Sequence, residues 1–155
     1  MPKHVLAKLE AELKLLKQAL LVDIPKEIAS AASQGDLSEN AEYEQALAKR
    51  DIYQNKVVAM EKRIAEVASL DVNRLPKDKA AYGSRVTLLD LDSSKEVTYK
   101  LVLPEELADD PTHLSISSPI GMALVGTSEG EEVKIKIPAG TKRFEVLNLV
   151  TVHNQ

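Results

Sequence analysis

Residues 35–43 read Gly-Asp-Leu-Ser-Glu-Asn-Ala-Glu-Tyr and separate two long stretches in which apolar residues recur at helical spacing. Before them, leucines follow one another at steps of three and four, at Leu6, Leu9, Leu13, Leu16 and Leu20. After them, the same rhythm continues through Tyr53, Val57, Met60, Ile64 and Val67. Because the break is short, the two helices can bury these apolar seams only against each other. The sequence therefore predicts an antiparallel α-helical coiled-coil hairpin with an acidic tip at residues 35–43.

The helix ends around the tip also carry signals. Asp36 is predicted to cap the second helix, with Glu39 at the capping-box position three residues later. The second helix is then predicted over about residues 37–69. The first is predicted over residues 3–33, with a kink or local loosening at residues 23–25 where a proline interrupts the pattern.

Four carboxylates lie within nine residues at this tip, those of Asp36, Glu39, Glu42 and Glu44. Spacing alone leaves two interpretations open. In the first, the carboxylates cap the helix and lie in solvent. In the second, Asp36 and Glu39 point outward from the end of the rod and complete the ligand shell of a Mg²⁺ ion that another molecule partly holds.

Composition limits the possible functions. The 155 residues include no cysteine, which excludes disulfides and thiolate metal sites, and the three histidines are too scattered for a zinc site. The formal net charge is −4, and neither half of the chain is basic, so an autonomous nucleic-acid binder is not expected. No apolar run reaches the length of a membrane span or a signal core. We expect a soluble, cytoplasmic protein that acts on nucleic acid only where another molecule holds it.

The sequence pattern changes beyond a predicted linker at residues 76–82. Apolar residues then alternate with polar ones in several short segments, which predicts strands. Residues 119–125 begin with proline and precede a glycine, which is typical of a short helix. The predicted fold class is α+β, with the hairpin in residues 1–75 and a small α+β domain in residues 83–155.

Several segments resemble the bacterial Gre transcript cleavage factors, the GreA/GreB family. Residues 35–43 closely resemble the family's tip motif. Ser118-Pro119-Ile120-Gly121, followed by Ala123-Leu124, is similar to its C-terminal motif. Lys8-Leu9-Glu10 with Glu12-Leu13 looks like the start of its first helix, and Ile24-Pro25 resembles its Arg-Pro. The similarity extends over nearly the whole chain.

This resemblance implies an FKBP-like fold for the C-terminal domain and a transcription elongation factor that is not itself an enzyme and has no cofactor of its own. The hairpin would enter the secondary channel of bacterial RNA polymerase and bring its tip to the catalytic centre of a backtracked complex. Asp36 and Glu39 would be the catalytic and metal-ligating acids. They would help to hold a Mg²⁺ ion shared with the polymerase and stimulate its cleavage of the RNA 3′ end.

The same resemblance assigns roles to other residues. Asn40, Glu42 and Tyr43 are expected to orient the tip, and Ser118 to Gly121 are expected to dock on the rim of the channel. Contact with DNA would be only indirect, through the polymerase. An antiparallel hairpin that buries its own seam also predicts a monomer.

The chain departs from the family pattern at positions that are commonly basic. Ala32 and Leu47 near the tip, and Met122 and Thr127 in the C-terminal segment, stand where the family commonly has basic residues. Within residues 23–50, three basic side chains compare with six acidic ones, so contact with RNA phosphates is expected to be weak.

Lys49 and Arg50 are expected to supply part of the missing contact with RNA and polymerase. The loss of the other basic residues keeps a second hypothesis open, in which the protein binds the secondary channel without catalytic effect and inhibits or modulates transcription. A third hypothesis is a coiled-coil scaffold unrelated to polymerase.

Overall fold

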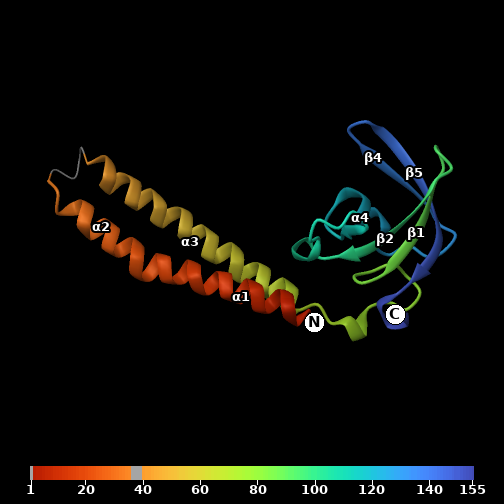
Figure 1. The fold of residues 1–155 in the computed structure, drawn as a ribbon, viewed down its shortest axis with the longest axis horizontal. Coiled ribbons are helices and arrows are strands. Elements are labelled where there is room, and N and C mark those ends of the chain that lie inside the picture. The colour runs from red at the N-terminus through yellow and green to blue at the C-terminus, as the bar shows by residue number, and fades with distance from the viewer. Residues whose placement is uncertain (1, 36–39) are drawn as a thin grey trace. The chain divides into compact units, whose positions relative to one another are not determined.

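The protein, analysed as a computed structural model, divides into two compact units, Met1–Leu70 and Asp71–Gln155 (Figure 1). The structure describes residues 2–35 and 40–155, so the predicted site residues Asp36 and Glu39 lie outside the described residues. Within the described part, none of the helices is both long enough and apolar enough to cross a membrane.

The first unit is a helical hairpin. Its elements are α1 (Lys3–Gln18), a π-helical turn (Ala19–Asp23), α2 (Ile24–Ala32) and α3 (Ala41–Ala68). After the tip, α3 returns alongside α2 and α1 (Figure 1). Members of the predicted seam are buried between the helices, among them Leu6, Leu9, Val57 and Val67. The predicted antiparallel hairpin is therefore confirmed.

The irregularity expected near Pro25 is also confirmed, and it extends toward the N-terminus. Proline lacks a backbone N–H, and its ring crowds the carbonyl group one turn earlier. The five residues Ala19–Asp23 wind as a π-helix, so that the N–H of Ile24 donates to the carbonyl oxygen of Ala19, five residues before it. The helical path therefore continues through the proline.

The start of α3 differs from the prediction. Its N-cap is Asn40 rather than Asp36, and its first helical residue is Ala41. Asn40 has an extended backbone, with φ −85° and ψ 98°, and its side chain accepts a hydrogen bond from the N–H of Tyr43. Aspartate and asparagine are both good caps. A contact of Asn40 with the opposite helix, described below, favours the later start.

The second unit is a five-stranded sheet in the order β3-β2-β1-β5-β4, together with one short α-helix (Figure 1). The elements are β1 (Arg85–Asp90), β2 (Glu96–Val102), β3 (His113–Ser115), α4 (Pro119–Leu124), β4 (Glu132–Ile137) and β5 (Gly140–Val150). Neighbouring strands are antiparallel, except that β2 and β3 are parallel. The fully buried side chains of its core include Val86, Leu88, Leu101, Leu124 and Val146. The predicted α+β fold class is confirmed.

The residues just before β1 pack as part of this second unit. Ala80 and Ala81 are buried. The N–H of Ala80 donates to the carbonyl oxygen of Thr127, and the carbonyl oxygen of Ala80 accepts from the N–H of Gly126, both at 2.8 Å. The chain that enters the sheet is therefore tied to the turn that follows α4.

Two buried threonines in this unit allow a matched stability test. Thr151 is 2% exposed, and its hydroxyl has no hydrogen-bond partner among the described residues. Thr151→Val is expected to raise the free energy of unfolding by about 1 kcal/mol, since it removes an unsatisfied hydroxyl at nearly constant shape.

Thr127→Val is the control, because the Thr127 hydroxyl donates to the carbonyl oxygen of Leu124 at 2.6 Å. The free energy of unfolding of this variant is expected to be about 1 kcal/mol lower than that of the wild type. Urea denaturation measures both effects, and the reverse order of stabilities would contradict the assignment.

Candidate functional site at the hairpin tip

Asn40 connects the two helices at the base of the tip. Its Oδ1 accepts a hydrogen bond from the N–H of Tyr43 at 3.1 Å, which caps α3. Its Nδ2 donates to the carbonyl oxygen of Ala31, in the last turn of α2, at 2.6 Å. The N–H of Tyr43 is one of the donors that a helix start leaves unpaired. The Ala31 carbonyl oxygen also accepts a hydrogen bond from the N–H of Gln34, at 3.2 Å. One amide group therefore caps α3 and joins it to α2.

These two contacts join described residues on either side of Asp36 and Glu39. Only one orientation of the amide places its oxygen toward the Tyr43 N–H and its nitrogen toward the Ala31 carbonyl group. Asn40, which is expected to orient the tip, therefore links α2 to α3. Tyr43 contributes its backbone N–H to the cap and has a half-buried side chain, whereas Glu42 is exposed.

The two contacts of Asn40 predict different effects for two substitutions. Asn40→Ala is expected to lower the free energy of unfolding of the hairpin by about 2 kcal/mol, because both hydrogen bonds are lost. Asn40→Asp keeps an acceptor for Tyr43 and loses the donor to Ala31, so a loss of about 1 kcal/mol is expected. Urea denaturation measures the stabilities. Amide hydrogen exchange at Tyr43 should stay slow in Asn40→Asp and become fast in Asn40→Ala; wild-type stability of Asn40→Ala would contradict this role.

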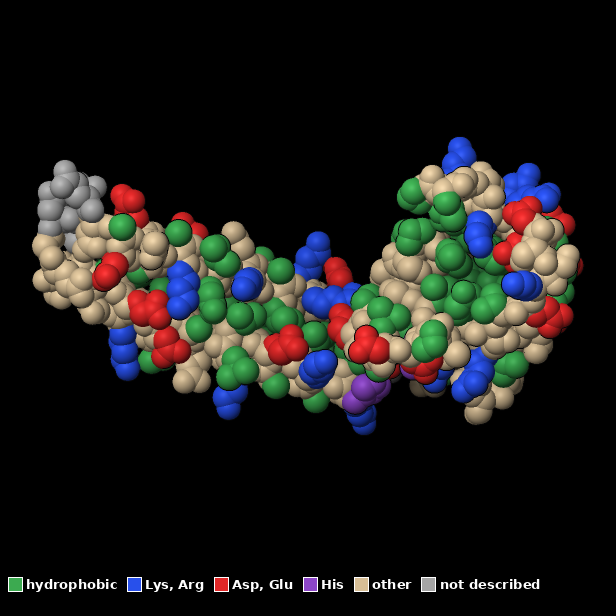
Figure 2. All heavy atoms as spheres, turned by 45° about the horizontal axis from the view of Figure 1, so that its top comes forward, with side chains coloured by type: hydrophobic (Ala, Val, Ile, Leu, Met, Phe, Trp, Pro, Cys, Tyr) green, Lys and Arg blue, Asp and Glu red, His purple; other side chains and the backbone are tan. Residues whose placement is uncertain are grey.

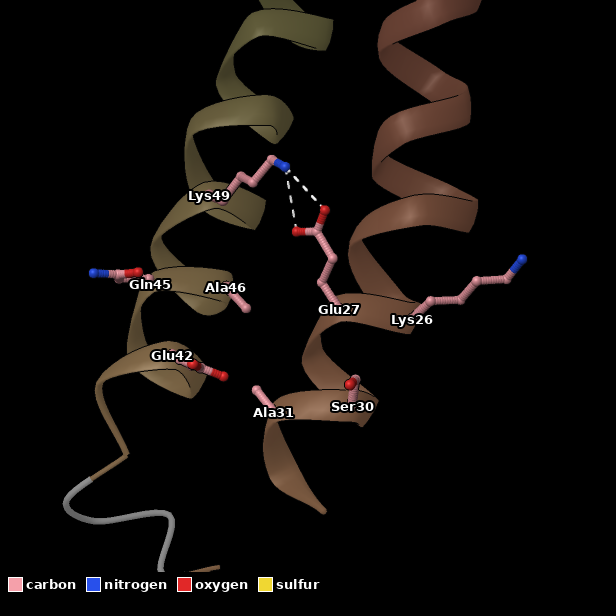
Figure 3. Close-up of a pocket in the computed structure, with 8 residues that line it drawn as sticks. All are labelled: Lys26, Glu27, Ser30, Ala31, Glu42, Gln45, Ala46 and Lys49. Carbon is pink, nitrogen blue, oxygen red and sulfur yellow. Dashed lines mark hydrogen bonds and ion pairs between the residues drawn. The ribbon is translucent and has the colours of Figure 1, made fainter. Parts of the chain in front are cut away.

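A cleft of about 510 Å³ lies between α2 and α3 behind the tip (Figure 3). Its lining residues are Lys26, Glu27, Ser30, Ala31, Glu42, Gln45, Ala46 and Lys49. The small side chains of Ala31 and Ala46 are buried. Glu27 and Lys49 extend toward each other across the cleft, whereas Lys26 extends away from α3 (Figure 3).

Lys49 and Glu27 form an ion pair between the two helices. The Lys49 Nζ lies 3.0 Å from Oε1 and 3.2 Å from Oε2 of Glu27. The hydrogen bond that Lys49 donates to Glu27 raises the pKa of Lys49 above its ordinary value. The Nζ also lies 5.8 Å from the centre of the Tyr53 ring. The charge of Lys49, expected to contact RNA or polymerase, is thus already matched within the hairpin.

Arg50, the other cation expected to contact RNA or polymerase, is exposed. Its Nε lies 3.8 Å from Oδ1 of Asp51. Acidic and basic side chains are intermixed along the hairpin on the face shown in Figure 2. A binder of bare nucleic acid usually has a basic face. The face shown in Figure 2 therefore lacks the basic character that is usual for such a binder.

The described part of the chain does not form a metal site by itself. Among residues 2–35 and 40–155, no group of three or more His, Asp or Glu side chains is placed to hold a metal ion. A carboxylate pair such as Asp36 and Glu39 fits the oxygen-ligand preference of Mg²⁺ but supplies only part of its coordination shell. Such a pair suits an ion shared with a partner.

The C-terminal motif shapes the start of α4. Ser118 is its N-cap, and Pro119 occupies the first turn, where a missing N–H is tolerated. The Ser118 Oγ accepts from the N–H of Gly121 at 3.0 Å and donates to the carbonyl oxygen of Ser115 at 2.6 Å. Ser118 and Gly121 therefore hold α4 against β3. Gly121 is buried, Ser118 and Ile120 are half-buried, and Pro119 is exposed.

Ile120 lines a cavity of about 440 Å³ in the second unit. Its other apolar lining residues are Val97, Tyr99, Ile137 and Phe144. Met122 follows the motif and is 61% exposed, whereas Thr127 is buried and bonds to the end of α4. Of the two departures from the basic pattern in this segment, only Met122 changes an exposed side chain.

Sequence analysis missed Glu27 as a residue of the tip region. Glu27 is 22 residues from Lys49 in the sequence and belongs to no local motif. The only available signal was the geometry of an antiparallel hairpin, in which positions at similar distances from the tip face each other. The contact between Asn40 and Ala31 escaped sequence analysis for the same reason.

Two family models match the chain. The model "Transcription elongation factor, N-terminal" matches residues 1–68, and "Transcription elongation factor, GreA/GreB, C-term" matches residues 75–150. The two matches together cover both compact units.

Individual proteins are similar over most of the chain. The transcription elongation factor GreA of Hyphomonas neptunium is 38% identical over 144 residues, which cover 93% of this chain and 92% of that protein. GreA of Rickettsia felis is 40% identical over 142 residues, which cover 92% of this chain and 88% of that protein. The crystal structure of Thermus aquaticus Gfh1 is 22% identical, with a TM-score of 0.43 and coverage of 93% and 92%.

Proposed function

Because the chain belongs to the GreA/GreB family of transcription elongation factors, we propose that its partner is bacterial RNA polymerase and that its hairpin enters the secondary channel of that enzyme. The 28 residues of α3 give the hairpin a length of about 42 Å. A projection two helices wide and this long reaches a site that a globular domain cannot enter. The protein acts in this way as a monomer.

At the polymerase active site, Asp36 and Glu39 supply carboxylate oxygens to a Mg²⁺ ion of the polymerase. When bound, such an ion would supply charge stabilisation for cleavage of the RNA 3′ end in a backtracked complex, and Asp36 and Glu39 would help to hold it. The factor thereby stimulates the nuclease activity of the polymerase and is not an enzyme itself.

The observation that carries this proposal is the double contact of Asn40. It holds the last turn of α2 to the first turn of α3, at 2.6 Å and 3.1 Å, on either side of the segment with the two acids. A link between two helices limits how they move relative to each other, and this lowers the entropy cost of presenting groups carried between them to a metal. Asn40 is a positioning residue in this mechanism, and Glu42 and Tyr43 support it.

The second unit docks on the rim of the channel. Pro119 and Ile120 offer apolar contact there, beside the cavity that Ile120 lines. Ser118 and Gly121 act indirectly, because their contacts with Ser115 set the position of α4.

One observation favours a second candidate function. Both cations expected to contact RNA lie next to carboxylates, Lys49 beside Glu27 and Arg50 beside Asp51. Weak contact with backtracked RNA suits a factor that occupies the channel and modulates transcription without stimulating cleavage.

A cleavage assay separates the two functions. A stalled, backtracked elongation complex is incubated at low Mg²⁺ concentration with and without the protein, and shortening of the RNA 3′ end is followed over time. We expect faster cleavage with the protein. Demonstrated binding without faster cleavage would overturn this proposal and favour the channel-modulating function.

A further inference from the structure

Lys49 is the cation that α3 directs into the cleft behind the tip, and a carboxylate already holds its ammonium group (Figure 3). We propose that Glu27 attenuates the factor's hold on backtracked RNA, because its carboxylate competes with an RNA phosphate for the ammonium group of Lys49. This inference rests on the proposed function. It adds that the Glu27 carboxylate acts as an internal counter-ion of Lys49.

The pair is placed where such competition is possible. The side chains of Lys49 and Glu27 are 42% and 46% exposed, so a phosphate group can approach the ammonium group from solvent. Exposed ion pairs contribute little net stability, because water screens them and two long side chains must be held still. The pair is therefore strong enough to reduce the affinity of Lys49 for a phosphate and weak enough to be opened by one.

The other cations of this region are placed differently. Lys26 also lines the cleft, but its side chain extends away from α3 (Figure 3). The Arg50 Nε is next to Asp51 on the same helix, at 3.8 Å. Among the residues that the structure describes, Lys49 is the only one of these three cations with an ion pair across the hairpin, so a change at Glu27 acts on one identified cation.

The expected size of the effect is modest. Releasing Lys49 from Glu27 should tighten binding to a complex with extruded RNA by about two- to fivefold, the range that exposed ion pairs allow. Binding to an active complex, which has no RNA segment in the channel, should not change. The slope of log affinity against log salt concentration should become steeper by about the amount that one additional phosphate contact contributes.

The experiment compares four proteins: the wild type, Glu27→Gln, Lys49→Met and the double variant. Dissociation constants are measured for backtracked and for active elongation complexes over a range of salt concentrations. Glu44→Gln is the matched control, because it removes one exposed carboxylate of α3 that is not paired with Lys49. The pKa of Lys49 in the free protein is followed by NMR, and in Glu27→Gln it should fall toward its ordinary value.

We expect Glu27→Gln to tighten binding only to the backtracked complex, and only when Lys49 is present. Equal tightening in the Lys49→Met background, or in Glu44→Gln, would mean a general charge effect and would overturn the inference. Equal tightening to the active complex would assign the contact to polymerase instead of RNA, and an unchanged Lys49 pKa would exclude the pairing. The experiment measures binding and not cleavage, so the two proposals can fail separately. The inference about Glu27 can be wrong although the protein stimulates cleavage, and it can be right although the protein does not.

Discussion

Gly121→Ala is expected to lower the free energy of unfolding of the second unit by about 3 kcal/mol or more. A Cβ atom at this position would overlap the carbonyl oxygen of Ser115 and would lie 2.9 Å from the Ser118 Oγ. The Ser115 carbonyl oxygen already accepts hydrogen bonds from the N–H and the hydroxyl of Ser118. Because the clash is with backbone, relief requires α4 to move away from β3.

Urea denaturation measures this loss, and hydrogen exchange should locate it in residues 71–155. Met122→Ala is the control on the same helix. Its side chain is 61% exposed, so a change within about 0.5 kcal/mol is expected. Equal stability of the two variants would show that α4 can shift without cost, and would leave Gly121 available for a direct docking role.

The Gly121 result bears on how the C-terminal motif is tested. A glycine and a serine in a motif associated with docking suggest contact with a partner, yet here both are explained by packing inside the unit. Loss of polymerase binding in Gly121→Ala would therefore report on folding. Substitutions at Ile120 test docking more directly, because its half-buried side chain lines a cavity wall.

The hairpin was predictable because its information is local and repeated. Apolar residues at steps of three and four leave one way to bury two seams, and Leu9 and Val57 are buried as that pattern requires. The loosening before Pro25 followed from the missing N–H of proline. The alternating segments beyond the linker likewise predicted a sheet with one helix.

The details of the tip were not predictable because they depend on contacts between distant residues. Sequence analysis predicts Asp36 as the cap, although aspartate and asparagine are about equally good caps. What distinguishes Asn40 is its hydrogen bond to Ala31 on the other helix, which no local pattern encodes. The sequence around Lys49 likewise gives no sign of its ion pair with Glu27, because the two residues are far apart in the chain.

The double substitution Asp36→Asn, Glu39→Gln is expected to reduce stimulated RNA cleavage by at least about 100-fold at low Mg²⁺ concentration. Metal stabilisation of the charge in the transition state is worth several kcal/mol, and each 1.36 kcal/mol is a factor of ten in rate. Neutral amides are nearly the same size as carboxylates but are poorer ligands for Mg²⁺. Cleavage time courses in a backtracked complex measure the effect over a range of Mg²⁺ concentrations.

The expected response to Mg²⁺ distinguishes ligand donation from a loss of binding. If the acids raise the occupancy of a weakly held ion, a high Mg²⁺ concentration should reduce the difference between the wild type and the double variant. The variant should still compete with the wild type for polymerase, because the rest of the hairpin and the second unit are unchanged. Glu44→Gln, which removes a neighbouring charge in the first turn of α3, should retain stimulation. Wild-type stimulation by the double variant at every Mg²⁺ concentration would exclude ligand donation, and loss of competition would mean that the two acids bind the polymerase instead of its metal.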